Sequence, residues 1–146
     1  EIWSVDAPYL SGFNQGDVPY FVPDHVIRGD TALPISQGKF VEITSATPSE
    51  GLLHIDREGG ILISGDCLQN WGKADKYCNF PAKIAMKLME FIKPHNIGPG
   101  WLRFAKPDGA ELKRLLDLQF DHVLPSHGAA VIGNAQALYE PKISSL

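Results

Sequence analysis

Residues 52–66 of this chain read LLHIDREGGILISGD, and this stretch predicts a β-hairpin. Leu52–Asp56 and Ile61–Ser64 are short apolar runs of the length that strands have. The four residues between them, REGG, favour a turn because glycine permits the backbone conformations that tight turns need. The hairpin ends abruptly at Gly65 and Asp66, so a carboxylate comes directly after an apolar strand.

Three further segments favour strands because apolar and β-branched residues dominate them. They are Ile2–Val5, Lys39–Thr44 and His122–Leu124. Residues 6–30 are rich in Pro, Gly and Asn, which predicts a loop with short extended pieces.

Three segments favour helices. Pro81–Lys93 suits a helix that starts with proline, with an apolar face made of Ile84, Ala85, Leu88, Met89 and Ile92. Asp108 stands three residues before Glu111, as in a capping box, and predicts a helix that buries Leu112, Leu115 and Leu116. Ala135–Tyr139 forms the last helix, with Asn134 as its cap, and residues 67–79 and 95–107 are expected to be loops. This order of elements predicts one layered α+β domain over residues 1–146.

Composition excludes several classes of protein. The chain is 44% hydrophobic and 21% charged with a net charge of −4, and no basic block marks a nucleic-acid or anionic-membrane surface. No apolar run approaches the roughly 18 residues of a membrane span, and the first residues do not resemble a secretory signal. Cys67 and Cys78 form no CxxC pair, so we expect free thiols and a cytoplasmic protein.

Two residues that follow apolar strands are the candidates for chemistry. Asp66 follows ILISG, and His127 follows VLPS. An acid and an imidazole at the ends of adjacent strands, each beside a glycine, are suited to binding one metal ion. The alternative is that both are ordinary turn residues.

Three motifs in order resemble the second half of the metallo-β-lactamase superfamily. That family has a T-P-G-H-T-P-G-S segment, a strand pair ending in T-G-D, and a V-L-P-G-H-G segment about 60 residues later. This chain has TSATPSE at residues 44–50, Ser64-Gly65-Asp66, and VLPSHG at residues 123–128, and Asp121 matches a common Asp before the last strand. The resemblance covers roughly residues 30–130.

The resemblance implies the C-terminal half of an αββα sandwich and a degenerate metal site. In the family the matching Asp bridges two metals and the final His binds the second, so Asp66 and His127 are the expected ligands of zinc or iron, with Asp66 also catalytic. Ala46 stands where the middle metal-binding His belongs, and no H-x-H-x-D-H motif occurs in the chain. Because a catalytic zinc usually takes three protein ligands and a water, a chain without any bound metal is the other expectation.

Three functions follow as hypotheses. The first is a divergent protein of hydrolase ancestry with lost or altered catalysis, whose cleft serves either to bind a small molecule or as part of the structure. The second is a metal-dependent hydrolase of an ester, amide or thioester whose other ligands lie in a further N-terminal segment. The third is a non-catalytic interaction domain. A homodimer, or a complex with the missing half, is expected because half a sandwich leaves an apolar sheet face open.

Other residues receive secondary interpretations. Loop aromatic residues either wall the cleft or pack beneath the loops, and they are Trp71, Tyr77, Phe80 and Trp101. Cys67 adjoins Asp66, but successive residues at a strand end point apart. The remaining histidines are interpreted as exposed, hydrogen-bonded or structural, and they are His25, His54, His95 and His122.

Overall fold

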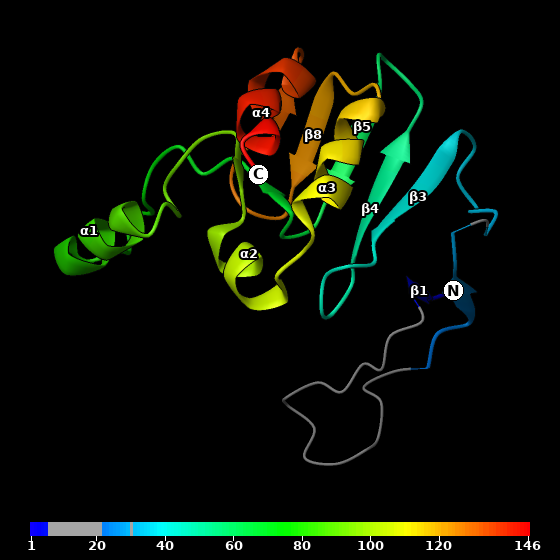
Figure 1. The fold of residues 1–146 in the computed structure, drawn as a ribbon, viewed down its shortest axis with the longest axis horizontal. Helices are drawn as coiled ribbons and strands as arrows, with labels where there is room; N and C mark the ends of the chain where they lie inside the picture. The colour runs from blue at the N-terminus through cyan, green and yellow to red at the C-terminus, as the bar shows by residue number, and fades with distance from the viewer. Residues whose placement is uncertain (6–21, 30) are drawn as a thin grey trace.

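The computed structural model describes residues 1–5, 22–29 and 31–146 and has a mixed α+β architecture (Figure 1). Within these ranges the largest sheet has five strands in the order β3-β4-β5-β8-β9. Their bounds are β3 Gly38–Ile43, β4 Glu50–Ile55, β5 Ile61–Ser64, β8 His122–Pro125 and β9 Val131–Ile132. The α+β class expected from the sequence is therefore confirmed.

The hairpin predicted from residues 52–66 forms as β4 and β5. The two strands are antiparallel, with Leu53 opposite Ile63 and Ile55 opposite Ile61. Gly60 has a φ of +97°, and a Cβ there would lie 2.0 Å from the carbonyl oxygen of Gln119, so the turn requires glycine. The residues flanking the turn are thus held against the segment that leads into β8.

Strands β5 and β8 run parallel, and this pairing positions the site. Ile61 lies opposite His122 and Ser64 lies opposite Pro125. Since the carboxyl ends of parallel neighbours meet at one edge of a sheet, the residues that follow Ser64 and Pro125 emerge side by side.

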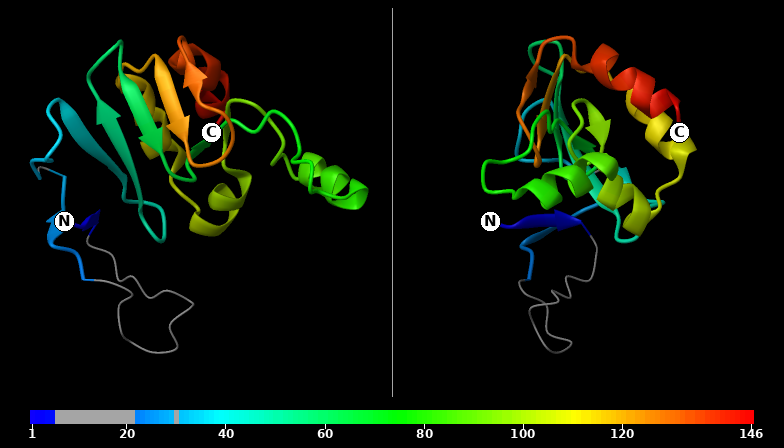
Figure 2. Two further views of the ribbon diagram at one scale, coloured as in Figure 1. Left: turned by 180° about the vertical axis from the view of Figure 1, so that it is seen from behind. Right: turned by 90° about the vertical axis from the view of Figure 1, so that its left-hand side faces the viewer.

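Helical segments cover one face of the sheet (Figures 1 and 2). They are α3 (Gly109–Lys113), the 3₁₀ turn η1 (Arg114–Asp117) and α4 (Ala135–Ser144), whereas α2 (Pro99–Ala105) lies beyond the end of β8. Leu112 and Leu115 are fully buried against Leu62 and Val123 of the sheet's inner face in one core cluster, as the sequence predicts, and Leu116 packs against it half-buried. Fully burying a leucine contributes about 1.5–3 kcal/mol, so this layer supplies much of the stability.

The prediction that residues 81–93 form a helix with a buried face is wrong in part. Helix α1 runs from Phe80 to Leu88, with Asn79 capping it by accepting from the amide of Ala82 at 2.9 Å. None of its residues is buried, and Leu88 is 80% exposed. Figure 1 shows why: α1 projects away from the sheet, so its apolar face meets no other layer among the described residues.

Four other predictions need correction. Residues 95–107 are not a continuous loop, because they contain β7 (Asn96–Ile97) and helix α2. Strand β7 pairs with β6 (Leu68–Gln69), which also breaks the loop expected at residues 67–79. Asn134 precedes α4 but makes no side-chain cap, since its backbone is left-handed with a φ of +56°. The helix is also longer than predicted and ends at Ser144.

The N-terminal segment is described only in part. Strand β1 (Trp3–Val5) matches the predicted first strand and pairs in parallel with β2 (His25–Ile27). The loop predicted for residues 6–30 falls largely on residues 6–21 and 30, which lie outside the described residues.

The sheet is apolar on the face that lacks helices as well. Phe40, Leu53, Ile63 and Leu124 lie opposite one another in consecutive strands and so share this outer face. Ile63 and Leu124 are each 37% exposed. Polar residues normally occupy a solvated sheet face, so this row of apolar side chains is typical of a sheet that carries a second layer.

No helix within residues 1–5, 22–29 and 31–146 is long and apolar enough to span a membrane. Cys67 and Cys78 are both free thiols, as the sequence predicts.

Candidate functional site

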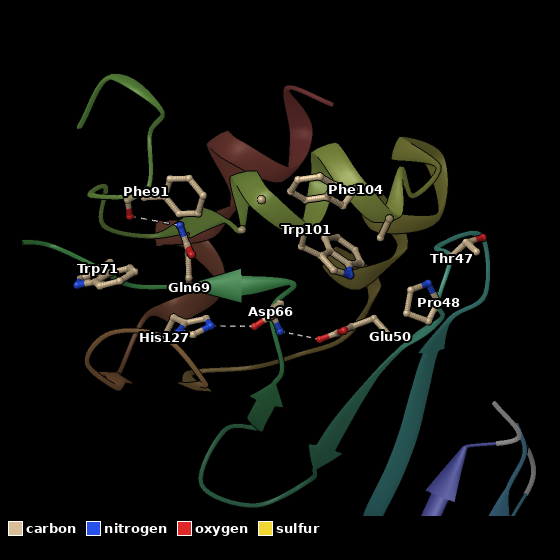
Figure 3. Close-up of a pocket in the computed structure, with 13 residues that line it drawn as sticks. Thr47, Pro48, Glu50, Asp66, Gln69, Trp71, Phe91, Trp101, Phe104 and His127 are labelled. Atoms are coloured by element: carbon tan, nitrogen blue, oxygen red, sulfur yellow. Dashed lines mark hydrogen bonds and ion pairs between the residues drawn. The ribbon is translucent and has the colours of Figure 1, made fainter. Parts of the chain in front are cut away.

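A cleft of about 540 Å³ opens at the carboxyl ends of β5 and β8 (Figure 3). The loop before β4, the segments after β5 and β8, and helix α2 all contribute to its walls. Its lining residues are Thr47, Pro48, Glu50, Asp66, Gln69, Trp71, Phe91, Gly98, Gly100, Trp101, Phe104, Ala105 and His127. The two residues selected from the sequence, Asp66 and His127, are therefore brought together in one cavity.

Asp66 and His127 contact each other directly. The Nε2 atom of His127 lies 3.0 Å from Oδ1 of Asp66, and both side chains are about half exposed. The ring of Trp71 stacks on the His127 imidazole, with centroids 6.0 Å apart and planes inclined by 9°. The carboxylate and the indole together fix the orientation of the imidazole at the mouth of the cleft.

The backbone around His127 is fixed by Asn70. The backbone amide of Asn70 donates to the backbone carbonyl of His127 at 3.0 Å, and the backbone carbonyl of Asn70 accepts from the Ala129 amide at 3.1 Å. Gly128, with a φ of +98°, lies so close that a Cβ would come within 2.0 Å of the Asn70 oxygen. The glycine beside His127 is thus needed for this close approach.

Glu50 joins Asp66 and His127 in the cleft, although its sequence position predicts no role there. Its Oε1 accepts from the backbone amide of Asp66 at 2.6 Å. Gly65 permits this contact, because a Cβ there would lie 2.0 Å from the same oxygen. Burial raises the pKa of Glu50 above its usual value, and the nearby charge of Asp66 adds to the effect.

The loop that carries Thr47 and Pro48 is tied to helix α3 by Glu111. The Glu111 carboxylate accepts from the amides of Thr44 and Ser45 at 3.0 and 2.9 Å and from both of their hydroxyls. Partial burial alone would raise the pKa of Glu111, but these hydrogen bonds outweigh it and lower the pKa. Asp108 caps α3 by accepting from the Ala110 amide at 2.8 Å, as the sequence predicts, but the Glu111 half of the predicted capping box does not form. The Asp108 amide donates to the Ser45 hydroxyl, and Glu111 holds the cleft wall instead.

Aromatic rings make most of the remaining wall. Trp71 and Trp101 line the cleft, as one interpretation of the sequence expected, whereas Tyr77 and Phe80 are 84% and 75% exposed and are not among its lining residues. The indole Nε1–H of Trp101 is buried and finds no acceptor within the described part of the chain. Phe91 and Phe104 also line the cleft.

The other histidines serve structural contacts. Nε2 of His54 lies 2.8 Å from the Gln119 carbonyl, and Nε2 of His122 lies 3.0 Å from the Glu58 carbonyl. His25 pairs with the Glu1 carboxylate at 3.6 Å, and His95 meets the Tyr139 ring edge-on. None of these four is among the residues that line the cleft.

Cys67 is buried beneath the cleft, whereas its neighbour Asp66 is about half exposed. Its thiol is fully buried, and burial, with a smaller contribution from the Glu50 charge, raises its pKa well above the usual range. A metal binds the thiolate, so this environment opposes ligation by Cys67.

The donor set does not fit a complete metal centre. Among the described residues, no three His, Cys, Asp or Glu side chains converge as a metal requires. Ala46, at the position where the resemblance expects a histidine, is 4% exposed and belongs to the hydrophobic core. Asp66 and His127 therefore supply two ligands, one fewer than a catalytic zinc usually takes from a protein.

The residues that sequence reasoning missed come from three separate segments. Glu50 begins β4, Phe91 follows α1, and Phe104 lies in α2. The only local signal was for Glu50, which stands at the end of the TSATPSE motif.

Comparisons of this chain with models of protein families, with curated proteins and with solved structures find no match. The functional interpretation of the cleft therefore depends on its own geometry and chemistry.

Proposed function

We propose that this chain is a divergent domain of the metallo-β-lactamase type, in which metal-dependent hydrolysis is lost or altered and the cleft binds a small organic molecule. The observation that carries the proposal is the pairing of Asp66 with His127 at the mouth of an aromatic cavity. The motifs that suggested the family meet at this point of the fold.

The chemistry of the pair favours ligand binding over catalysis by a metal. The Asp66 carboxylate and the His127 imidazole pair with each other at 3.0 Å. No third metal-binding side chain joins them among the residues described. A cavity of this size with aromatic walls and a few convergent polar groups is typical of small-molecule sites. The polar groups would orient the ligand, and the rings would supply most of the affinity.

The outer face of the sheet supports the sandwich part of the proposal. Phe40, Leu53, Ile63 and Leu124 form an apolar row on the side that the helices leave open. An αββα sandwich places a second sheet there. A second copy of this chain, or an upstream half of the domain, would bury this row in the same way.

The test is to measure the metal content of the purified full chain after equilibrium dialysis against zinc and, separately, against ferrous iron. We expect no stoichiometric metal, because two half-exposed ligands hold a divalent ion weakly. Asp66→Ala and His127→Ala should therefore leave the metal content unchanged. Asp56→Ala, which removes an exposed carboxylate outside the cleft, is the matched control.

A stoichiometric metal that survives dialysis, and that both Asp66→Ala and His127→Ala abolish while Asp56→Ala retains it, would overturn the proposal. The result would favour a second function, a metal-dependent hydrolase of an ester, amide or thioester. One observation supports that alternative: two donors at about 2.0–2.2 Å from one zinc ion lie roughly 3–3.4 Å apart, and the Asp66–His127 separation is 3.0 Å. Its remaining ligands would come from residues outside those described.

A further inference from the structure

A second cavity, the outer groove, adjoins the cleft. It has a volume of about 610 Å³ and lies between the end of α1 and helix α2. Its lining residues are Leu88, Met89, Phe91, Pro99, Gly100, Arg103 and Phe104. Leu88 and Phe104 are 80% and 81% exposed, which is costly for such large apolar side chains unless something covers them.

The groove and the cleft are continuous. Phe91, Gly100 and Phe104 line both of them. Gly100 keeps the passage open, since a Cβ at this position would come within 3.3 Å of the Phe91 ring. Figure 3 shows Phe91 and Phe104 on the side of the cleft away from Asp66 and His127. An occupant that enters at the polar end can therefore extend over these rings into the groove.

The polar end selects the head group of that occupant. Two carboxylates, Glu50 and Asp66, line it with one imidazole, and no lysine or arginine is among the residues that line the cleft. An anionic head would be repelled by the carboxylates, whereas an ammonium or hydroxyl group can donate hydrogen bonds to them. The indoles of Trp71 and Trp101 also suit a cation.

We propose that the cleft and the outer groove form one site for a linear amphipathic molecule with an ammonium or hydroxyl head and an aliphatic tail. The head binds at Asp66, beside Glu50, and the tail runs across Phe91 and Phe104 to Leu88 and Met89. This inference rests on the proposed ligand-binding function and adds the class of ligand.

The experiment is a titration of the full chain with linear alkylamines of increasing length, each below its micelle concentration, followed by tryptophan fluorescence and calorimetry. A fully buried methylene strengthens binding about fourfold, so in a half-open groove we expect about twofold for each added methylene. Dodecanoate, with the same tail and an anionic head, should bind at least tenfold more weakly than dodecylamine.

Two variants separate the tail site from the head site. Leu88→Gln lies outside the cleft and should weaken binding of dodecylamine severalfold while leaving binding of hexylamine unchanged. Asp66→Asn should weaken both amines. Phe80→Ser, on the same helix and equally exposed but lining neither cavity, is the matched control and should change nothing.

The possible failures are distinguishable. If amines bind in a manner that depends on Asp66 but is independent of chain length, the tail site is refuted and the proposed function stands. If long chains bind equally well with either head and Asp66→Asn has no effect, the head assignment is refuted. If neither the amines nor dodecanol, titrated in the same way, binds, the ligand class is refuted, and the metal analysis then decides the proposed function independently.

Discussion

Replacing Glu111 with alanine is expected to loosen the attachment of the cleft wall to helix α3 while leaving the sheet intact. The carboxylate accepts four hydrogen bonds, two from backbone amides and two from hydroxyls of Thr44 and Ser45. The substitution removes these four hydrogen bonds at once. Two neighbouring contacts remain, because the Ser45 hydroxyl still accepts from the Asp108 amide at 2.8 Å and the Thr47 amide still donates to the Ala105 carbonyl at 3.0 Å. The wall formed by Thr47 and Pro48 should therefore become less firmly held but stay in place.

The magnitude follows from the exposure of the donors. A hydrogen bond to a charged group contributes about 1.5–3 kcal/mol when protected from solvent. Thr44 and Ser45 are exposed, so water replaces much of what Glu111→Ala removes, and the total loss should be about 2 kcal/mol. For a chain of this size that loss corresponds to a melting temperature lower by about 6 °C.

Thermal and urea unfolding measure this loss directly. Glu111→Gln keeps one acceptor oxygen and should lose less than Glu111→Ala. Glu140→Ala, an exposed glutamate in α4, serves as the control. If Glu111→Ala unfolds at the same temperature as Glu140→Ala, the carboxylate contributes nothing and the reasoning fails.

The pH dependence gives a second readout of the same contact. Despite partial burial, the hydrogen bonds from Ser45 and Thr44 hold the pKa of Glu111 below 4.5. A lowered pKa means that the folded state favours the ionised carboxylate, so its stabilisation is present above pH 4.5 and is lost as the pH falls through the lowered value. Glu111→Gln should lack this part of the acid-induced loss of stability.

Three further predictions concern the residues around the cleft. Gly98→Ala should lower the free energy of unfolding by more than about 2 kcal/mol, because its Cβ would lie 2.2 Å from a backbone oxygen. Gly72→Ala, with nothing within 4 Å of its Cβ, is the control and should be neutral, so equal urea midpoints for the two variants would contradict the prediction. Glu50→Gln should be at least as stable as the parent at pH 7, because the raised pKa of Glu50 means that folding disfavours its charged form. This advantage should shrink as the pH falls through the raised pKa. A loss of stability at pH 7 would show instead that the charge is needed. Cys78 should react with a thiol reagent in the folded protein, whereas Cys67, which is fully buried and has a raised pKa, should react only after unfolding. Equal reaction rates for the two thiols would contradict the burial of Cys67.

The sequence by itself determined the parts of this protein that depend on neighbours in the chain. The hairpin of β4 and β5 was readable because two apolar runs flank a turn rich in glycine. The sequence also predicts that Asp66 and His127 lie at the ends of strands, since a single residue, Gly65 or Ser126, separates each of them from an apolar strand.

Only the tertiary structure decided which residues meet across the chain. The parallel pairing of β5 with β8 joins segments about 60 residues apart, and it is this pairing that brings Asp66 within 3.0 Å of His127. Helix α1 was predicted correctly in kind but wrongly in burial, because an apolar face shows that a helix can pack and not what it packs against. Glu50, Phe91 and Phe104 were missed as cleft residues because their role comes from three segments that only the folded chain places around one cavity.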